Sequence, residues 1–269
     1  MEFNYIIEKI KNAKIIEHPF PHLDIKQFLS KEHLQLIINE KQIHFEEKKT
    51  HDEVYKELVE NGWKIQDFPG CIKNWDYYKE YLKGNKKFFI KNTDKEKNMG
   101  ITFRLHNYKN QTIKKLIEFM NSDKFHKTLK KKFNIKEETT IITAIQKNLT
   151  GYEITPHPDI RKKCLTYLLN INNNGEIENL DCNTHLLEFK DEYKYIQEDW
   201  EENKDKERDW VPWEWCNTIK KTNENNSMVL FHPANNPPTL HAIRLNYNHL
   251  KYQRTQIYGN LMYKHPQKT

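Results

Sequence analysis

The chain has 269 residues, a formal net charge of +6 and a hydrophobic fraction of only 36%. It is nevertheless rich in aromatic residues, with 6 Trp, 14 Tyr and 13 Phe, whereas disordered chains are poor in them. No run approaches the roughly 18 consecutive apolar residues of a membrane-spanning helix, and no signal-peptide pattern opens the sequence. We therefore expect a folded, cytoplasmic protein, and we expect its four cysteines to be reduced because they form no Cys-x-x-Cys pair.

The first half of the chain is predicted to be mainly helical. An extended piece is expected at residues 22–29, followed by a helix that begins after Ser30, a residue type that caps helix N-termini. Apolar residues with helical spacing predict two more helices, at 111–122 and 122–133. The lysines at 130–132 then lie on the solvated side of the second helix, which argues against nucleic acid as a partner. Residues 40–100 carry no pattern that assigns them a role.

The second half of the chain changes character. Short β-branched and aromatic runs, split by Asn, Gly and Pro clusters, predict strands at 138–149, 163–172, 184–190, 227–233 and 252–263. Helices followed by strands are typical of an α+β fold in which a helical layer backs a β-sandwich or barrel. The sequence contains no internal repeat and no Gly/Ser linker, so we predict one domain over residues 1–269.

An acidic, tryptophan-rich insertion is predicted at residues 187–216. Between residues 187 and 210 it carries ten acidic and five basic side chains. For its tryptophan-rich part, residues 198–216, one interpretation is a solvated segment whose tryptophans pack on the rim of the barrel. The other is a lid over the site that helps to select a cationic or amino-bearing substrate. The sequence leaves both open.

The residues that point to chemistry begin with His157 and Asp159, which are separated by one proline. In an extended chain, residues two apart project to the same face, so an imidazole and a carboxylate can meet there. Such a pair is two thirds of the facial triad of two histidines and one carboxylate, which binds Fe(II) and leaves positions open for cosubstrate and oxygen. The pair alone is weak support for a metal site.

Two further residues strengthen the metal-site hypothesis. His241 follows a predicted strand and supplies a second imidazole. We favour it over the neighbouring His232, which lies nine residues earlier. Arg254 opens the last strand, 13 residues after His241, and a buried guanidinium offers a charged, planar fork to a carboxylate. On that strand Arg254 shares a face with Gln256, so this side is expected to line the pocket.

With these residues in place, the sequence resembles the Fe(II)/2-oxoglutarate-dependent oxygenases, and most closely their prolyl-hydroxylase-like branch in bacteria and phages. The resemblance is carried by His157-Pro158-Asp159, the run 163–172, the strand 227–233 with His241, and the strand that begins Arg254-x-Gln256. The segments 18–30 and 122–135 are also similar to the opening segment and the helix before the barrel in bacterial and phage members.

The resemblance implies a double-stranded β-helix (jelly-roll, cupin-like) core at 136–269, with the acidic insertion 187–216 and a mainly helical support at 1–135. It implies that His157, Asp159 and His241 hold Fe(II), and that Arg254 binds the C5 carboxylate of 2-oxoglutarate. The expected activity is hydroxylation of an unactivated C–H bond with O2, releasing succinate and CO2. The substrate is expected to be a small molecule, such as an amino acid, or a peptidyl residue.

The sequence departs from the family pattern at one cosubstrate position, where Asn170 stands in place of a tyrosine. An amide still donates a hydrogen bond, so Asn170 and Gln256 stay candidate cosubstrate contacts beside Arg254. Asp159 is retained, which argues against the halogenating relatives. Two alternatives remain open: a catalytically silent jelly-roll protein, and a cupin-like zinc enzyme. The oligomeric state is not predicted.

Overall fold

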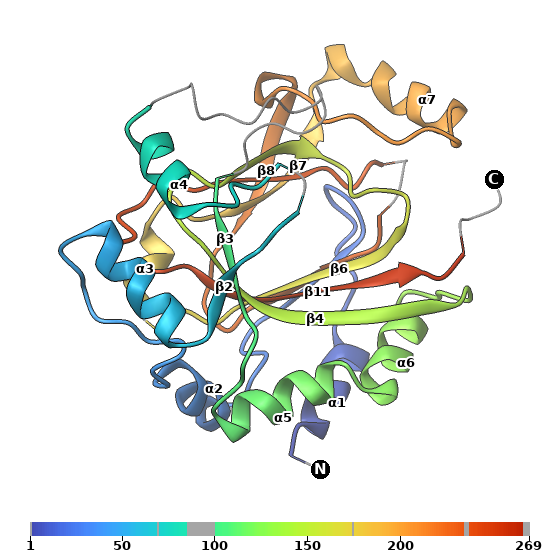
Figure 1. Cartoon of the computed structure of the whole chain (residues 1–269). Helices are drawn as coiled ribbons and strands as arrows, with labels where there is room; N and C mark the ends of the chain where they lie inside the picture. Colours follow the sequence, from blue (N-terminus) through green and yellow to red (C-terminus); the bar gives the residue numbers. More distant parts are fainter. Residues whose placement is uncertain (1, 69, 85–99, 174, 234–236, 266–269) are drawn as a thin grey trace.

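A computed structural model describes residues 2–68, 70–84, 100–173, 175–233 and 237–265. In these residues two antiparallel β-sheets are surrounded by helices (Figure 1). The larger sheet has seven strands in the order β1-β9-β6-β11-β4-β3-β2, and the smaller has four in the order β5-β10-β7-β8. The mixed α and β content agrees with the predicted class of fold.

The strands are β1 (His22–Ile25), β2 (Trp63–Ile65), β3 (Thr102–Leu105), β4 (Thr139–Asn148), β5 (Glu153–His157), β6 (Lys163–Asn170), β7 (Thr184–Phe189), β8 (Cys216–Thr222), β9 (Met228–Phe231), β10 (His241–Arg244) and β11 (Thr255–Tyr263). From β4 onward the chain passes repeatedly from one sheet to the other. The strands β4, β6, β9 and β11 join the larger sheet, while β5, β7, β8 and β10 form the smaller one. The longest pairing joins β4 to β11, so the two ends of the second half lie side by side.

The helices are α1 (Asn4–Asn12), α2 (Lys31–Ile38), α3 (His51–Glu60), α4 (Trp75–Leu82), α5 (Gln111–Met120), α6 (Asp123–Lys132) and α7 (Tyr195–Glu202). The Ser30 side chain caps α2 by accepting a hydrogen bond from the His33 amide, as the sequence predicts. Helix α3 begins with a capping box formed by Thr50 and Glu53. Helices α5 and α6 fall where the helical spacing predicts them.

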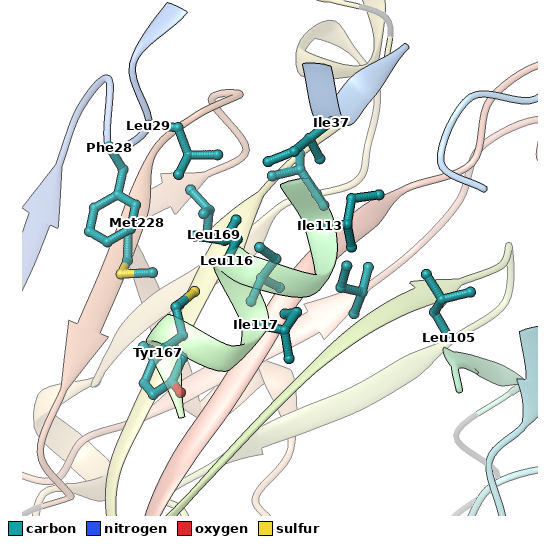
Figure 2. Packing of buried hydrophobic residues seen from close by; sticks show 14 of the residues in the cluster. Phe28, Leu29, Ile37, Leu105, Ile113, Leu116, Ile117, Tyr167, Leu169 and Met228 are labelled. Atoms are coloured by element: carbon teal, nitrogen blue, oxygen red, sulfur yellow. The ribbon is translucent and has the colours of Figure 1, made fainter. Parts of the chain in front are cut away.

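Helix α5 covers the outer face of the larger sheet (Figure 2). It buries the apolar residues that its periodicity singles out, Ile113, Leu116, Ile117 and Met120. These side chains join one hydrophobic cluster with Leu169 of β6. The buried side of α5 therefore holds the outer face of this sheet, which leaves the opposite face turned toward the smaller sheet.

One close approach within the larger sheet requires a glycine. Tyr167 of β6 lies opposite Gly259 of β11, and a Cβ atom added at Gly259 would meet the Tyr167 ring at 2.0 Å. The Tyr167 hydroxyl in turn hydrogen-bonds to Thr143 of β4. The ring therefore lies across the neighbouring strand, and only glycine leaves it room.

The segment 1–135 supplies β1, β2 and β3, which extend the larger sheet at both edges. β1 lies within the extended piece predicted at 22–29, whereas the sequence pattern does not predict β2 and β3. These two strands are only three and four residues long, too short to set up a clear alternation. His241 follows β9 in the chain, as expected, but it begins a strand of its own, β10.

All four cysteines are free and buried. No helix among the described residues combines the length and the apolar character needed to cross a membrane.

Candidate metal centre

The smaller sheet brings two histidines together. His157 ends β5, His241 begins β10, and the two residues are direct partners across these antiparallel strands. Their ring centroids lie 4.4 Å apart. A register shift follows between His241 and Ile243, and such a bulge re-aims side chains at the end of a strand.

Asp159 completes the group from the loop after β5. One ligand atom from each of His157, Asp159 and His241 lies within 4.8 Å of the others. Asp159 is 2% exposed, and its Oδ1 lies 3.9 Å from Nε2 of His241. Among the described residues, no other group of three or more His, Cys, Asp or Glu side chains forms such a constellation.

Backbone carbonyls orient both imidazoles in the same way. The Nδ1 of His157 lies 2.7 Å from the Thr155 carbonyl oxygen, and the Nδ1 of His241 lies 3.0 Å from that of Thr239. A carbonyl only accepts, so each Nδ1 carries the proton and each neutral ring keeps the lone pair on Nε2. This is the outer-shell contact that fixes the tautomer of metal-binding histidines.

The protonation states suit a cation. Burial, together with the adjacent His241, lowers the pKa of His157 to about 3. Burial also lowers the pKa of His241. Burial alone would raise the pKa of Asp159, but the Lys163 ammonium and the two histidines hold it well below its usual range. At neutral pH the group therefore presents two neutral imidazoles and one carboxylate.

Two residues of β6 hold the carboxylate of Asp159. The Lys163 ammonium binds its Oδ1, and the Thr166 hydroxyl donates to its Oδ2. Burial would lower the pKa of Lys163, yet the ion pair with Asp159 raises it above the usual range. Neither residue was predicted from the sequence. The available signal was limited to Thr166, a polar residue among mostly apolar positions of this strand.

The acidic insertion is attached to the same segment. Trp210 lies 5.4 Å from His157, ring centroid to ring centroid, and the Val211 amide donates to the Pro156 carbonyl at 2.8 Å. Within the insertion, Trp200 is buried against Phe189. Its tryptophans thus pack on the rim of the smaller sheet, as one of the two interpretations predicts; whether the segment acts as a lid stays a prediction.

The side chain of the insertion that reaches the carboxylate ligand is basic. The Arg208 guanidinium donates to the backbone carbonyl of Asp159 and is 8% exposed. In return, Arg161 donates to the backbone of the insertion at Trp200 and Asn203. No pattern in the sequence marks Arg208, because it is one of five basic residues dispersed among the acids of this segment.

The three predicted cosubstrate residues form one chain of hydrogen bonds. Arg254 donates through Nη1 to Oε1 of Gln256 at 2.8 Å, and Gln256 donates through Nε2 to Oδ1 of Asn170 at 2.8 Å. Gln256 and Asn170 are direct partners between β11 and β6. Arg254 also donates to the Cys182 carbonyl and to Thr184.

Arg254 is buried without an acidic partner among the described residues. It is 1% exposed, and its hydrogen-bond acceptors there are all uncharged: Asn148, Cys182, Thr184 and Gln256. Burial lowers the pKa of Arg254 to about 10, so it stays charged at neutral pH. Buried charges are normally paired, but this guanidinium has only uncharged acceptors among the described residues.

The competing histidine takes no part in the triad. His232 Nδ1 contacts the Cys164 carbonyl, and His232 is absent from the group of potential ligands.

A separate hollow of about 360 Å³ is lined by residues of the segment 52–79 and contains none of the candidate metal or cosubstrate residues.

No family model matches the sequence, and no curated protein matches it. Solved structures do match it. A prolyl-4-hydroxylase from Pseudomonas putida aligns with a TM-score of 0.47 and 8% identity, covering 98% of this chain and 100% of that one. An oxidoreductase of the 2OG-Fe(II) oxygenase family from Burkholderia pseudomallei gives 0.37 and 8%, covering 83% and 95%. A prolyl hydroxylase from Trichoplax adhaerens, in complex with a peptide fragment of hypoxia-inducible factor, gives 0.35 and 12%, covering 81% and 95%. The solved proteins to which the chain is similar are thus prolyl hydroxylases and 2OG-Fe(II) oxygenases.

Proposed function

We propose that this protein is an Fe(II)- and 2-oxoglutarate-dependent dioxygenase that hydroxylates a C–H bond of a small molecule or a peptidyl residue. The observation that carries the proposal is the convergence of His157, Asp159 and His241, with their ligand atoms within 4.8 Å of one another. Two histidines and one carboxylate with open positions are the donor set of non-heme Fe(II) oxygenases.

The residues present fit the metal. The backbone carbonyls at Thr155 and Thr239 leave Nε2 of both imidazoles as lone-pair donors, and Asp159 is ionised. With 2-oxoglutarate and O2, the bound iron would supply oxidation of an unactivated C–H bond, with succinate and CO2 as coproducts. Thr166 holds the second oxygen of Asp159, so the ligand oxygen stays aimed at the two histidines.

Arg254 supports 2-oxoglutarate as the cosubstrate. A carboxylate brought to this buried guanidinium would supply the charge that its uncharged partners lack, and a guanidinium binds a carboxylate through two parallel hydrogen bonds. Gln256 and Asn170 extend the same polar row and are the proposed neighbours of that carboxylate. The site also excludes bulk water, since all three side chains are buried.

We further infer that the core is a double-stranded β-helix, of the jelly-roll type, supported by the helices of the first half. The alternation of β4 to β11 between two antiparallel sheets supports this inference, as does the packing of α5 on the outer face of the larger sheet. In such a core the space between the sheets holds the ligands, and both His157 and Arg254 lie there.

A cupin-like zinc enzyme is the second candidate, because zinc also binds two histidines and a carboxylate. Arg254 favours the oxygenase, since a hydrolytic zinc site has no need of a buried, unpaired guanidinium. A silent binding protein has no need of two histidines oriented through Nδ1 beside a carboxylate.

The test is an anaerobic titration of the apoprotein with Fe(II) and 2-oxoglutarate. We expect a visible absorption band that needs both components, followed by slow release of succinate when O2 is admitted. A folded protein that gives no band with metal present would contradict the proposal. Preferred uptake of zinc, together with hydrolytic activity, would support the zinc enzyme instead.

A further inference from the structure

Arg104 of β3 faces the same side of the larger sheet as the metal centre. It lies opposite Gln146 of β4, which lies opposite Gln256 of β11, which lies opposite Asn170 of β6. Residues directly opposite one another in a sheet share a face, and Thr166, four residues before Asn170, shares it too. Because the Thr166 hydroxyl reaches Asp159, Arg104 points into the same space.

The guanidinium of Arg104 is not satisfied by the described residues. Its Nε is buried and has no hydrogen-bond partner there, and no ion pair joins it to a described acidic side chain. Its Cζ lies 5.9 Å from the centroid of the Tyr258 ring. The Lys163 ammonium lies 5.8 Å from the same centroid, so the two cations border one aromatic ring beside Asp159.

Two basic side chains contact the carboxylate ligand. The Lys163 ammonium pairs with the carboxylate of Asp159, and the Arg208 guanidinium donates to the backbone carbonyl of the same residue. The acidic Asp24 is on the same face of the sheet, but it is already engaged by Lys26 and Lys220 at the β1 edge.

We propose that Arg104 and Lys163, which both lie against the Tyr258 ring, form a subsite that binds an oxyanion group of the primary substrate, a carboxylate or a phosphate. The inference rests on the proposed function, because it assumes that the substrate binds beside the metal. It differs from the cationic or amino-bearing substrate that the lid interpretation of the acidic insertion favours. The side chain of that insertion that reaches the carboxylate ligand is Arg208, a base.

The subsite is tested without iron or 2-oxoglutarate, so its failure is separate from that of the proposed function. Inorganic phosphate, and acetate in a parallel series, are titrated into the full chain by calorimetry. Arg104→Gln should weaken the binding of the preferred anion by at least about ten-fold, since a charge-assisted hydrogen bond is lost. Which of the two anions binds more tightly distinguishes a phosphate-bearing from a carboxylate-bearing substrate.

The control separates this subsite from an exposed arginine. Arg244→Gln removes a guanidinium that pairs with Glu153 on β10, and it should leave the anion affinity within about two-fold. Arg104→Lys should bind the anion more tightly than Arg104→Gln, because a positive charge remains. Absence of binding in the wild type, or equal binding in Arg104→Gln, would overturn the proposal.

A distance measurement tests whether the subsite serves the substrate. With Mn(II) bound to the chain, the phosphorus signal of bound phosphate should relax faster, and the enhancement should disappear in Asp159→Ala. Phosphate that binds through Arg104 but shows no enhancement, in protein shown to bind Mn(II), would overturn the assignment to the substrate. A chain that binds phosphate through Arg104 but no metal would instead contradict the proposed function.

Discussion

The described residues include two close pairs of histidines, and the two pairs use their ring nitrogens differently. In the pair His157 and His241, each Nδ1 is bound to a backbone carbonyl and Asp159 lies within reach. In the other pair, Nδ1 of His51 lies 2.9 Å from Nε2 of His249, so the two rings bond to each other. The centroid distances, 4.4 Å and 4.8 Å, are nearly the same.

The comparison shows that proximity and burial do not make a metal site. One ring nitrogen of each histidine in the His51–His249 pair is already used in their mutual hydrogen bond, and no carboxylate completes a triad there. That pair joins α3 to the loop before β11, which fits a structural role. The pair at the metal centre leaves both Nε2 atoms to an outside partner.

The largest effect is expected for the residue that distinguishes the two pairs. Asp159→Ala should lower the affinity for Fe(II) or Mn(II) by more than about 100-fold, because removal of an outer-shell contact alone costs ten- to 100-fold. Succinate formation should be lost with it. Calorimetric metal titration and a succinate assay measure the two effects. Asp159→Asn, which keeps an acceptor for Thr166, controls for the fold; full activity in Asp159→Ala would remove this residue from the triad.

The sequence carries much of this site but not its surroundings. His157 and Asp159 are two residues apart on an extended chain, so their shared face follows from local geometry. Lys163 follows on the next strand, where nothing local indicates that its ammonium turns back to Asp159. Arg208 arrives from a segment 49 residues after Asp159, and such a contact depends on the tertiary fold alone.

The fold, like the site, could be predicted from the sequence only in part. Strong helical periodicity places α5, and runs of β-branched residues place β4, β6 and β11. β1 falls within the extended piece predicted at 22–29. The short strands β2 and β3 form because the edge of the larger sheet offers them a partner, and three or four residues do not encode that on their own. Arg104 lies on one of them, which is why its place beside the metal centre is visible only in the structure.

The second effect contrasts two arginines. Arg254→Ala should weaken 2-oxoglutarate binding by about 2–5 kcal/mol, the usual cost of truncating one partner of a buried charge pair. The same change at Arg244, which is exposed and paired with Glu153, should alter the affinity by less than about 1 kcal/mol. Calorimetry with 2-oxoglutarate in the presence of a divalent metal measures both. Equal losses, or an unchanged affinity in Arg254→Ala, would place the carboxylate anchor elsewhere.

The third effect concerns the other histidine pair. His249→Phe keeps an aromatic ring in a position that is 1% exposed but removes the hydrogen bond with His51. The free energy of unfolding should fall by about 1–3 kcal/mol, because a buried partner is left unsatisfied, while the metal affinity stays at the wild-type value. Urea denaturation and metal titration give the two quantities. A variant that loses metal binding without unfolding would give this pair a functional role.

The smallest effect is a change in how stability depends on pH. Burial lowers the pKa of His249 to about 3, with His51 adding to the shift, whereas an unfolded histidine titrates near 6.5. As the pH falls below about 6.5, the unfolded chain therefore takes up a proton that the folded chain refuses. Stability is lost at up to about 1.4 kcal/mol per pH unit for this group.

His249→Phe lacks this contribution, so the stability advantage of the wild type should shrink between about pH 6.5 and 4.5, above the range in which carboxylates titrate. Urea denaturation of both proteins across this range measures the difference in slope. Parallel curves would mean that His249 is protonated in the folded protein, and the two histidine pairs would then differ in charge as well as in the use of their nitrogens.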